Sequence, residues 1–212
     1  MPQTGGPITI DGTVCTLDGA PFRGSSPLSV IGGVVAAADG SFYVLDDVHH
    51  VRRYTLGAGG GCALTQDVSF GVGGSVAMAL PARAEQVSAD AEGHVFLSAG
   101  SAGTDRFTRG AVDFHCSVRQ PIALSPSGVD AFTLPWGDPV EHVRFSATGC
   151  TLEPWQHASL GDAPLVADVE SIVFLDATQL LVSAHCDARP RVHAARVFDL
   201  NGQPRGPELL TP

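Results

Sequence analysis

The sequence brings two aspartates and two histidines together in one short segment, Asp46-Asp47-Val48-His49-His50. Carboxylates and imidazoles are the side chains that hold zinc or a harder divalent cation in proteins. A metal site here would use one aspartate and one histidine, and His49 and His50 are its candidate ligands. The alternative is an ordinary polar loop between two strands, because alternation along a strand would place His49 and His50 on opposite faces. The pattern favours the polar loop.

A tryptophan between two prolines is the main candidate for contact with a partner. Trp136 lies in Pro135-Trp136-Gly137-Asp138-Pro139, a loop that the prolines stiffen. An exposed tryptophan in such a loop can stack on a sugar or pack on a peptide. Together with Asp46 and Asp47 it forms the predicted binding set. The competing interpretation, which is the commoner use of this residue, is that Trp136 covers the edge of a sheet.

Short strands must position these residues, because the chain repeats one pattern of strands and turns. In the clearest copy the strand 40–45 is rich in aromatic and β-branched residues, and the strand 51–56 alternates apolar and polar residues. The same order recurs around residues 94–98, 130–134 and 180–183. In the second of these four copies we expect a loop over 99–105, followed by strands over 110–114 and 116–118.

A four-stranded unit repeated at such intervals predicts an all-β fold, a β-propeller, whose blades take about 40 to 50 residues each. About four to five blades are visible, and residues 1–212 form a single repeat domain. The first hairpin, near residues 8–17, resembles only the last two strands of a blade. A small closed ring, an open arc and a fragment of a larger propeller are all compatible with the pattern. An incomplete ring would expose sheet faces and favour oligomers.

Charge and hydropathy exclude two classes of partner. The formal net charge is −10, from 22 acidic and 12 basic residues, and an acidic surface repels nucleic acid. No apolar run reaches the roughly 18 residues that would cross a membrane. The segment Met1 to Pro7 lacks the basic start and apolar stretch of a signal peptide. The localisation therefore stays open, and a secreted or periplasmic protein is suspected if an export signal is missing from this chain.

Five cysteines, an odd number, leave at least one without an intramolecular partner, and they do not form a CxxC motif. Four of them follow a turn near the start of a repeat's last strand: Cys15, Cys62, Cys116 and Cys150. Equivalent positions on neighbouring blades should be separated by more than the roughly 7 Å that a disulfide allows between Cα atoms. We therefore expect these four cysteines not to pair with one another.

The segment Asp39 to Tyr54 resembles the NHL-type propeller repeat, in which a turn, an aromatic-rich strand, an aspartate and a short Asn-His loop precede a basic and apolar strand. His49 stands here where the family has asparagine. The resemblance implies a propeller and extends to the gluconolactonase-like enzymes, in which an early glutamate binds a divalent ion in the central channel. It would give that role to Glu170. The family's other ligands find no match, since Asn201, in an outer turn, is the only asparagine.

Two functions follow from these observations. The favoured hypothesis is a non-catalytic binding or scaffold propeller that presents loops to a protein or carbohydrate partner, without a cofactor. The alternative is a metal-dependent hydrolase of the gluconolactonase type that uses the central channel and a divalent metal. The hydrolase would need three or four carboxylate, imidazole or amide groups that converge on one point.

Overall fold

The computed structural model describes residues 8–10, 13–15, 31–46, 50–56, 64–78, 84–118, 122–133, 140–155, 168–186, 192–207 and 209–211. This part of the chain is all-β: its strands are joined by turns, and its one helical element is a single 3-10 turn, η1 (Gly100–Ala102). No helix in these ranges is long and apolar enough to cross a lipid bilayer. The all-β class that the sequence predicts is confirmed.

Within the described ranges, four larger antiparallel sheets follow one another along the chain. In each sheet the strands pair in the order of the sequence, except that the fifth strand of the first sheet, β7 (Ser75–Ala77), pairs with β5 (His50–Leu56). The first sheet contains β3 (Ile31–Ala36), β4 (Ser41–Asp46), β5 (His50–Leu56), β6 (Leu64–Gln66) and β7 (Ser75–Ala77). The second contains β8 (Gln86–Ala89), β9 (His94–Ala99), β10 (Gly103–Thr108) and β11 (Ala111–Cys116). The third contains β12 (Ile122–Leu124), β13 (Asp130–Thr133), β14 (Glu141–Phe145) and β15 (Cys150–Pro154). The fourth contains β16 (Asp168–Phe174), β17 (Gln179–Cys186), β18 (Val192–Asp199) and β19 (Leu209–Thr211).

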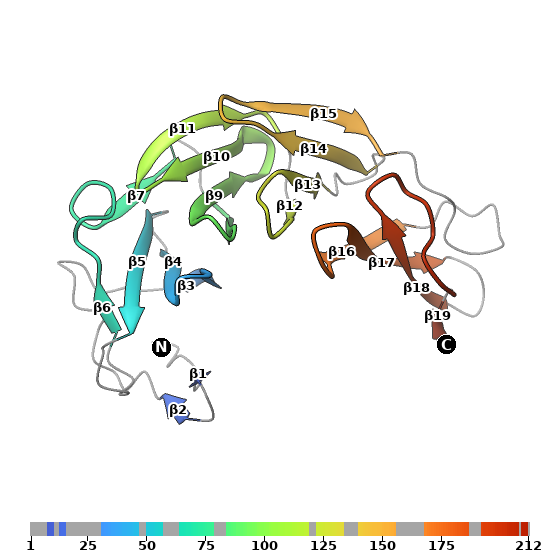
Figure 1. Ribbon diagram of the computed structural model, residues 1–212, viewed down its shortest axis with the longest axis horizontal. Helices are drawn as coiled ribbons and strands as arrows, with labels where there is room; N and C mark the ends of the chain where they lie inside the picture. Colours follow the sequence, from blue (N-terminus) through green and yellow to red (C-terminus); the bar gives the residue numbers. More distant parts are fainter. Residues whose placement is uncertain are drawn as a thin grey trace.

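The four sheets follow an open arc, which Figure 1 shows from one side. The first strands β3, β12 and β16 lie toward the inside of the arc, and β6, β11 and β15 lie toward its outside. A separate hairpin, β1 (Ile8–Ile10) with β2 (Thr13–Cys15), lies beyond the first sheet. The fourth sheet lies at the opposite end, so in this view the hairpin does not dock beside the last repeat (Figure 1).

Apolar layers hold neighbouring sheets of the described chain together. Tyr43, Leu45, Val95, Leu97 and Phe107 belong to the layer between the first and second sheets. Phe96, Phe114, Ala131, Val143 and Phe145 fill the layer between the second and third. Phe132, Trp155, Ile172, Leu180 and Phe198 fill the layer between the third and fourth. Burying each large apolar side chain contributes about 1.5–3 kcal/mol relative to its exposure, and these layers therefore fix how each sheet stands against the next.

The first sheet departs from the simple four-stranded pattern at its outer edge. β6 pairs with the end of β5, Tyr54–Leu56, and β7 pairs with its beginning, His50–Arg52. The residues between the two short strands, Asp67 to Gly74, leave the sheet as a loop, which we call the edge loop. The outer strand is thus split in two, and the edge loop projects from the middle of the sheet's outer edge.

The predicted loop over 99–105 is wrong. Gly103–Thr108 forms β10, which pairs along its whole length with β9, and the chain turns between them through η1. The turn after β10 consists of Arg109 and Gly110, both with positive φ, 49° and 86°, as expected for a two-residue hairpin turn that matches strand twist. The sequence pattern did not indicate this strand, because Thr104, Asp105 and Arg106 are polar.

The prediction that the matching cysteines do not pair is also wrong, because Cys116 and Cys150 form a disulfide with a Cα–Cα distance of 6.0 Å. Cys116 is the last residue of β11, whereas Cys150 is the first residue of β15. The two positions are therefore not equivalent in their sheets. The incorrect strand boundaries in the second repeat caused the error, and the disulfide joins the outer strands of the second and third sheets.

Candidate ligand groove

The structure describes the side chain of only one of the six residues that the sequence nominated. His50 opens β5, is half-buried and has an interaction partner. Asp46 ends β4, and Glu170 lies in β16 at a register shift between Val169 and Ser171, but both side chains are outside the described part. Asp47, His49 and Trp136 lie outside the described residues altogether. The metal and binding roles given to these six residues stay predictions.

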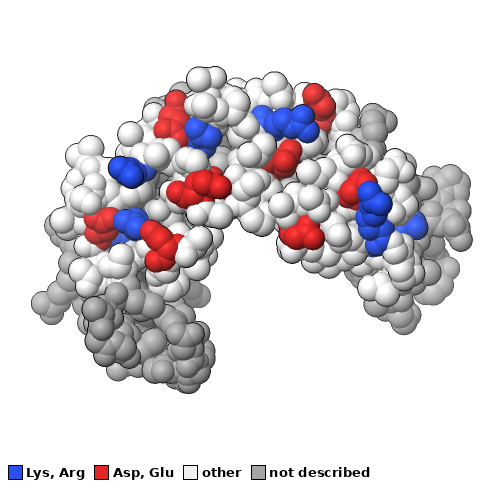
Figure 2. Space-filling model, viewed as in Figure 1, with Lys and Arg blue, Asp and Glu red and all other residues white. Residues whose placement is uncertain are grey.

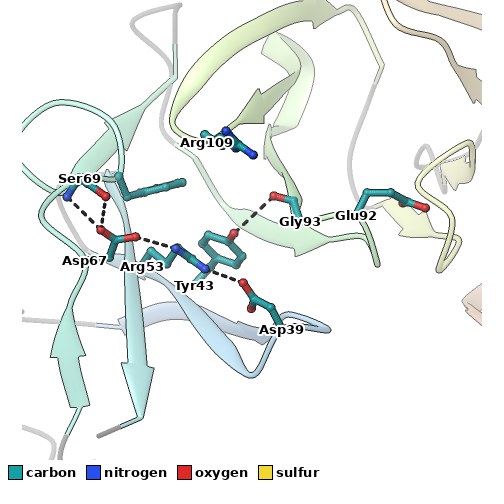
Figure 3. A pocket seen from close by; sticks show the side chains of 9 residues that line it. Asp39, Tyr43, Arg53, Asp67, Ser69, Glu92, Gly93 and Arg109 are labelled. Atoms are coloured by element: carbon teal, nitrogen blue, oxygen red, sulfur yellow. Dashed lines mark hydrogen bonds and ion pairs between the residues drawn. The ribbon is translucent and has the colours of Figure 1, made fainter. Parts of the chain in front are cut away.

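A groove of about 430 Å³ opens between the first and second sheets instead. This volume lies within the range of roughly 300–1,000 Å³ that is usual for small-molecule sites. Its walls come from the β3–β4 turn, β4, β5, the edge loop, and the β8–β9 and β10–β11 turns. The lining residues are Asp39, Tyr43, Arg53, Asp67, Ser69, Phe70, Glu92, Gly93 and Arg109, and Figure 3 shows how they surround the opening.

Arg53 ties the groove's polar wall together. Its guanidinium donates to Asp39 Oδ2 at 2.5 Å and to Asp67 Oδ2 at 2.6 Å (Figure 3). Its Nε donates to Ser41 Oγ at 3.2 Å. All three guanidinium nitrogens are therefore engaged with protein groups, and Arg53 links the β3–β4 turn to the edge loop. Its structural role leaves little capacity for a ligand.

Each aspartate that binds Arg53 also caps its own turn. Asp39 Oδ1 accepts from the N–H and hydroxyl of Ser41, at 2.9 and 2.6 Å. Asp67 Oδ1 accepts from the N–H and hydroxyl of Ser69, at 3.0 and 2.6 Å. Hydrogen bonds to a carboxylate favour its charged form. The Ser41 hydroxyl and N–H, then Arg53, lower the pKa of Asp39, and the Ser69 hydroxyl, followed by Arg53, lowers the pKa of Asp67. Both groups stay ionised at neutral pH.

Two aromatic rings form the floor of the groove. Tyr43 and Phe70 are 3% exposed each, and their ring centroids are 5.5 Å apart. The Tyr43 hydroxyl donates to the carbonyl of Gly93 at 3.4 Å, which links the first sheet to the β8–β9 turn. Burial raises the pKa of Tyr43, so the hydroxyl remains a neutral donor. The floor is thus rigid, apolar and anchored to both sheets.

Two charged groups of the groove are left uncommitted. Arg109 and Glu92 are exposed, and among the described residues neither forms a hydrogen bond or an ion pair. Arg109 reaches over the groove from the β10–β11 turn, and Glu92 projects from the β8–β9 turn (Figure 3). The groove therefore offers a ligand one free cationic donor and an aromatic floor, and the free carboxylate of Glu92 lies at its margin, directed away from Tyr43 and Arg53 in this view (Figure 3).

The edge loop and the β10–β11 turn meet backbone to backbone beside the groove. A Cβ on Gly110 would overlap the backbone nitrogen of Gly71, and a Cβ on Gly71 would overlap the carbonyl oxygen of Ser75. Gly71 also has a positive φ of 65°, a conformation that glycine adopts without strain. These two glycines let the turn that carries Arg109 lie directly against the edge loop.

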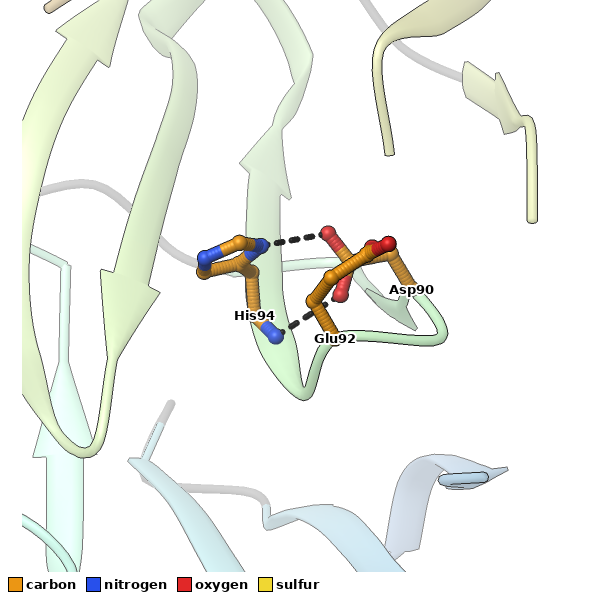
Figure 4. Close-up of side chains that lie close together, drawn as sticks. All are labelled: Asp90, Glu92 and His94. Atoms are coloured by element: carbon orange, nitrogen blue, oxygen red, sulfur yellow. Dashed lines mark hydrogen bonds and ion pairs between the residues drawn. The ribbon is translucent and has the colours of Figure 1, made fainter. Parts of the chain in front are cut away.

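A second cluster of possible metal ligands lies next to the groove. Asp90, Glu92 and His94 have ligand atoms within 4.8 Å of one another, and Figure 4 shows them around the β8–β9 turn. Asp90 Oδ1 accepts from the His94 N–H at 2.8 Å, and Asp90 Oδ2 lies 2.6 Å from His94 Nδ1. Turn capping by Asp90 accounts for this geometry, since both of its oxygens are already engaged.

The charges on this side of the arc alternate in sign. In Figure 2 acidic and basic side chains are interspersed along the arc, over all four sheets, and no large patch of one sign forms on this face. Local pairs explain part of the pattern, such as Arg106 Nε with Asp113 at 2.8 Å and Arg205 with Asp199 at 2.8 Å.

Comparison with known proteins gives a structural likeness only. No protein-family model matches the chain, and no curated protein sequence matches it. Among the solved structures, 113 chains match. One of them is a crystal structure of a candidate 6-phosphogluconolactonase from Bacteroides fragilis, with a TM-score of 0.52 and 16% identity. The alignment covers 85% of this chain and 52% of that chain. This chain therefore spans about half the length of that structure, and the likeness concerns the fold alone.

Sequence reasoning did not find the groove, because the groove is made by two adjacent repeats. Asp39, Tyr43 and Arg53 lie in the segment that the sequence singled out, but Arg109 lies where the strand boundaries were wrong. The only available signal was the Arg109-Gly110 pair, a sequence that suits a tight hairpin turn. Without the correct register of β10, that pair could not be assigned to the same opening as Tyr43.

Proposed function

We propose that the chain forms part of a β-propeller that works as a binding domain, with the groove as its site for a small carbohydrate ligand. Four-stranded antiparallel sheets that follow one another in an arc, first strand inside and last strand outside, support the propeller. So does the likeness to a longer chain among the solved structures. The NHL-type repeat in the first sheet is part of the same proposal.

The main support for a binding role is that some charged groups of the groove are paired with one another whereas others are free. Arg53, Asp39 and Asp67 satisfy one another. Arg109 remains available above the floor of Tyr43 and Phe70, and Glu92 remains available at the margin of the groove. A sugar presents hydroxyl groups that both donate and accept hydrogen bonds and a C–H face that packs on aromatic rings. A guanidinium, a carboxylate and an aromatic floor match these three properties.

The composition of the groove also supports binding rather than catalysis. Its nine lining residues include neither histidine nor cysteine. Its one serine, Ser69, donates its hydroxyl hydrogen to Asp67. The one hydroxyl next to a carboxylate in the groove is thus Ser69 beside Asp67, and the lowered pKa of Asp67 makes this carboxylate a weak general base for covalent catalysis.

The test is a thermal-shift screen of the purified protein against a panel of neutral and acidic mono- and disaccharides. We expect at least one sugar to raise the melting temperature, because a ligand that binds only the folded state stabilises it. Arg109→Ala and Glu92→Ala should each abolish the shift, and Arg144→Ala, an exposed arginine on the third sheet, should preserve it. If no sugar shifts the wild-type protein, or if the Arg109 variant responds normally, the proposed site is wrong.

A second function, a lactone hydrolase, is favoured by one observation: the solved structure described above carries the name of a lactonase. This function would use the inside of the arc and Glu170, with a divalent metal as the resemblance implies. Hydrolysis of 6-phosphogluconolactone by the purified protein, with and without added calcium or zinc, is the direct assay. Turnover that Glu170→Gln removes would replace the binding-domain proposal with the hydrolase.

A further inference from the structure

Arg109 has a backbone conformation that its residue type disfavours. Its φ is 49°, and it is the one non-glycine residue with a positive φ in the described part of the chain. A two-residue hairpin turn in which both residues have positive φ favours asparagine, aspartate or glycine at the first of them, because a longer side chain there raises the free energy of the turn. The turn alone therefore does not account for an arginine at this position, and residues held in disfavoured conformations cluster at functional sites.

Ion pairing within the protein does not account for Arg109 either. Arg53 and Arg106, which lie in the same two sheets, bind carboxylates at 2.6 and 2.8 Å. Among the described residues Arg109 forms no hydrogen bond or ion pair, although Asp67 and Glu92 line the same groove. Its side chain reaches over the opening of the groove instead (Figure 3). Within the described part of the chain, the guanidinium therefore faces the groove with its donors free.

The shape of a guanidinium selects the group that it binds best. Its five N–H donors form a planar fork, and it has no acceptor. Two parallel N–H donors match the two oxygens of a carboxylate, and such charge-assisted pairs are stronger than hydrogen bonds between neutral groups. A sugar hydroxyl offers one oxygen and no charge, so a neutral sugar uses only part of this fork. The fork of Arg109 thus complements a sugar that carries an acidic group.

We propose that the ligand of the groove is a hexuronate, a sugar with one carboxylate, and that Arg109 selects it over the neutral hexose. The carboxylate binds the Arg109 guanidinium, and the sugar ring lies over the floor of Tyr43 and Phe70. Glu92, at the margin of the groove, accepts hydrogen bonds from hydroxyl groups of the sugar. This inference rests on the sugar-binding function proposed above and names the class of sugar.

The charges of the groove favour one negative charge on the ligand over two. The lining residues carry three carboxylates and two guanidiniums, which belong to Asp39, Asp67, Glu92, Arg53 and Arg109. The carboxylates of Asp39 and Asp67 share Arg53, so one guanidinium is left for the ligand. A singly charged carboxylate matches this one cation, whereas a phosphate with two charges would be repelled by the excess of acidic groups. The charges therefore point to a uronate and not to a sugar phosphate.

Calorimetric titration of the full chain with matched pairs of sugars tests the inference. The pairs are glucuronate with glucose, galacturonate with galactose and mannuronate with mannose. The members of a pair differ only in whether the terminal carbon carries a carboxylate or a hydroxyl. We expect at least one uronate to bind roughly tenfold more tightly than its hexose, or better, because a hydrogen bond to a charged group is the stronger one. Salt should reduce this preference, since Arg109 is exposed and its charge is screened.

Arg109→Asn is the decisive variant, because asparagine suits the positive φ but lacks the charge and the fork. This variant should bind the uronate no more tightly than the hexose, and without ligand it should melt at the wild-type temperature or above. The matched control is Arg144→Asn, which changes an exposed arginine on the third sheet. The control should keep the uronate preference.

The outcomes separate this inference from the function on which it rests. Hexoses that all bind as tightly as their uronates overturn the inference and leave the sugar site intact. A uronate preference that survives in Arg109→Asn also overturns it, as does tighter binding of glucose-6-phosphate than of every uronate. A melting temperature of Arg109→Asn well below the wild-type value would overturn it too, because the arginine would then serve the fold. If no sugar binds at all, acidic or neutral, the proposed function itself is wrong.

Discussion

The space between the first and second sheets differs from the space between the third and fourth, although the same four-stranded unit borders both. At the latter, aromatic rings fill the space: Phe132 stacks on His142 at 4.7 Å and meets Trp155 edge-on at 4.9 Å. The Trp155 indole N–H donates to the Leu200 carbonyl at 2.9 Å. At the former, an apolar layer gives way at one end to the charged groove around Arg53. The repeat thus determines which sheets face each other. The side chains at each interface between sheets, which we call a joint, determine whether it is filled by an apolar layer or opens into a groove.

The largest expected effect comes from opening the sealed joint. Phe132→Ala removes a fully buried ring that contacts His142, Trp155 and Phe174. We expect the free energy of unfolding to fall by about 3–5 kcal/mol, the usual cost of truncating a buried phenylalanine. Urea denaturation measures it. Val129→Ala, a change at an exposed position just before β13, should cost less than about 0.5 kcal/mol. A cost below about 1 kcal/mol for Phe132→Ala would show that this joint is not the tightly packed one.

The joint between the second and third sheets sharpens the comparison, because a covalent bond reinforces it. Replacing both Cys116 and Cys150 by alanine removes the disulfide between β11 and β15. Closing a loop of 34 residues in sequence restricts the unfolded chain, and its loss should cost about 2–4 kcal/mol. Urea denaturation under non-reducing conditions measures the cost. Each single alanine variant should lose a similar amount, since either one breaks the bond; an unchanged stability would contradict the pairing.

A pair of glycines tests how closely the second and third sheets approach at their turns. Gly128 and Gly93 both have positive φ, 67° and 85°, so alanine strains each by roughly 1–2 kcal/mol. A Cβ at Gly128 would also overlap the Asp90 carboxylate, whereas a Cβ at Gly93 meets nothing within 4 Å. Gly128→Ala should therefore cost about 1–3 kcal/mol more than Gly93→Ala. Thermal melting of the two variants gives the difference, and equal costs would exclude the close approach.

The smallest expected effect is the acid dependence of the groove. The pKa of Asp67 is lowered by the Ser69 hydroxyl and by Arg53, so its carboxylate stabilises the folded state above the unfolded pKa of roughly 3.9. This contribution is lost as the pH falls through the folded pKa. Asp67→Asn should lower stability at pH 7 and flatten the pH dependence below about pH 4. Melting temperatures from pH 2.5 to 7 measure both effects. A curve for Asp67→Asn that runs parallel to the wild-type curve would contradict this role of Asp67.

Most of the sheet order could be predicted from the sequence, because turns with glycine and aspartate separate strands of regular composition. The strands β4, β5 and β13 fall within a residue or two of their expected positions. β10 could not be predicted, since Thr104, Asp105 and Arg106 give it a polar sequence. In the structure Thr104 and Asp105 are fully buried. Asp105 Oδ1 lies 2.6 Å from His115 Nδ1, and the hydroxyl oxygens of Thr104 and Ser98 are 2.8 Å apart. Such internal pairing leaves no hydropathy signal.

The candidate site was predictable only in part. Local spacing could propose Asp46 and His50 as chemically capable residues, because it shows which residues are near one another along the chain, and only the family resemblance proposed Glu170. The groove depends on the packing of one repeat against the next, and no pattern within a single repeat contains that information. Arg53 illustrates the limit: its position on a strand was expected, but its two carboxylate partners come from different turns.

The backbone contact between Gly71 and Gly110 affects the proposed site without being part of it. No side chain separates the edge loop from the β10–β11 turn at this contact. Main-chain atoms that do not line the groove therefore set the position of the Arg109 guanidinium. A methyl group added at Gly110 would meet the backbone of Gly71 and displace this arginine without altering its chemistry. Variation at this position would thus change the proposed site while every residue that lines it stayed the same.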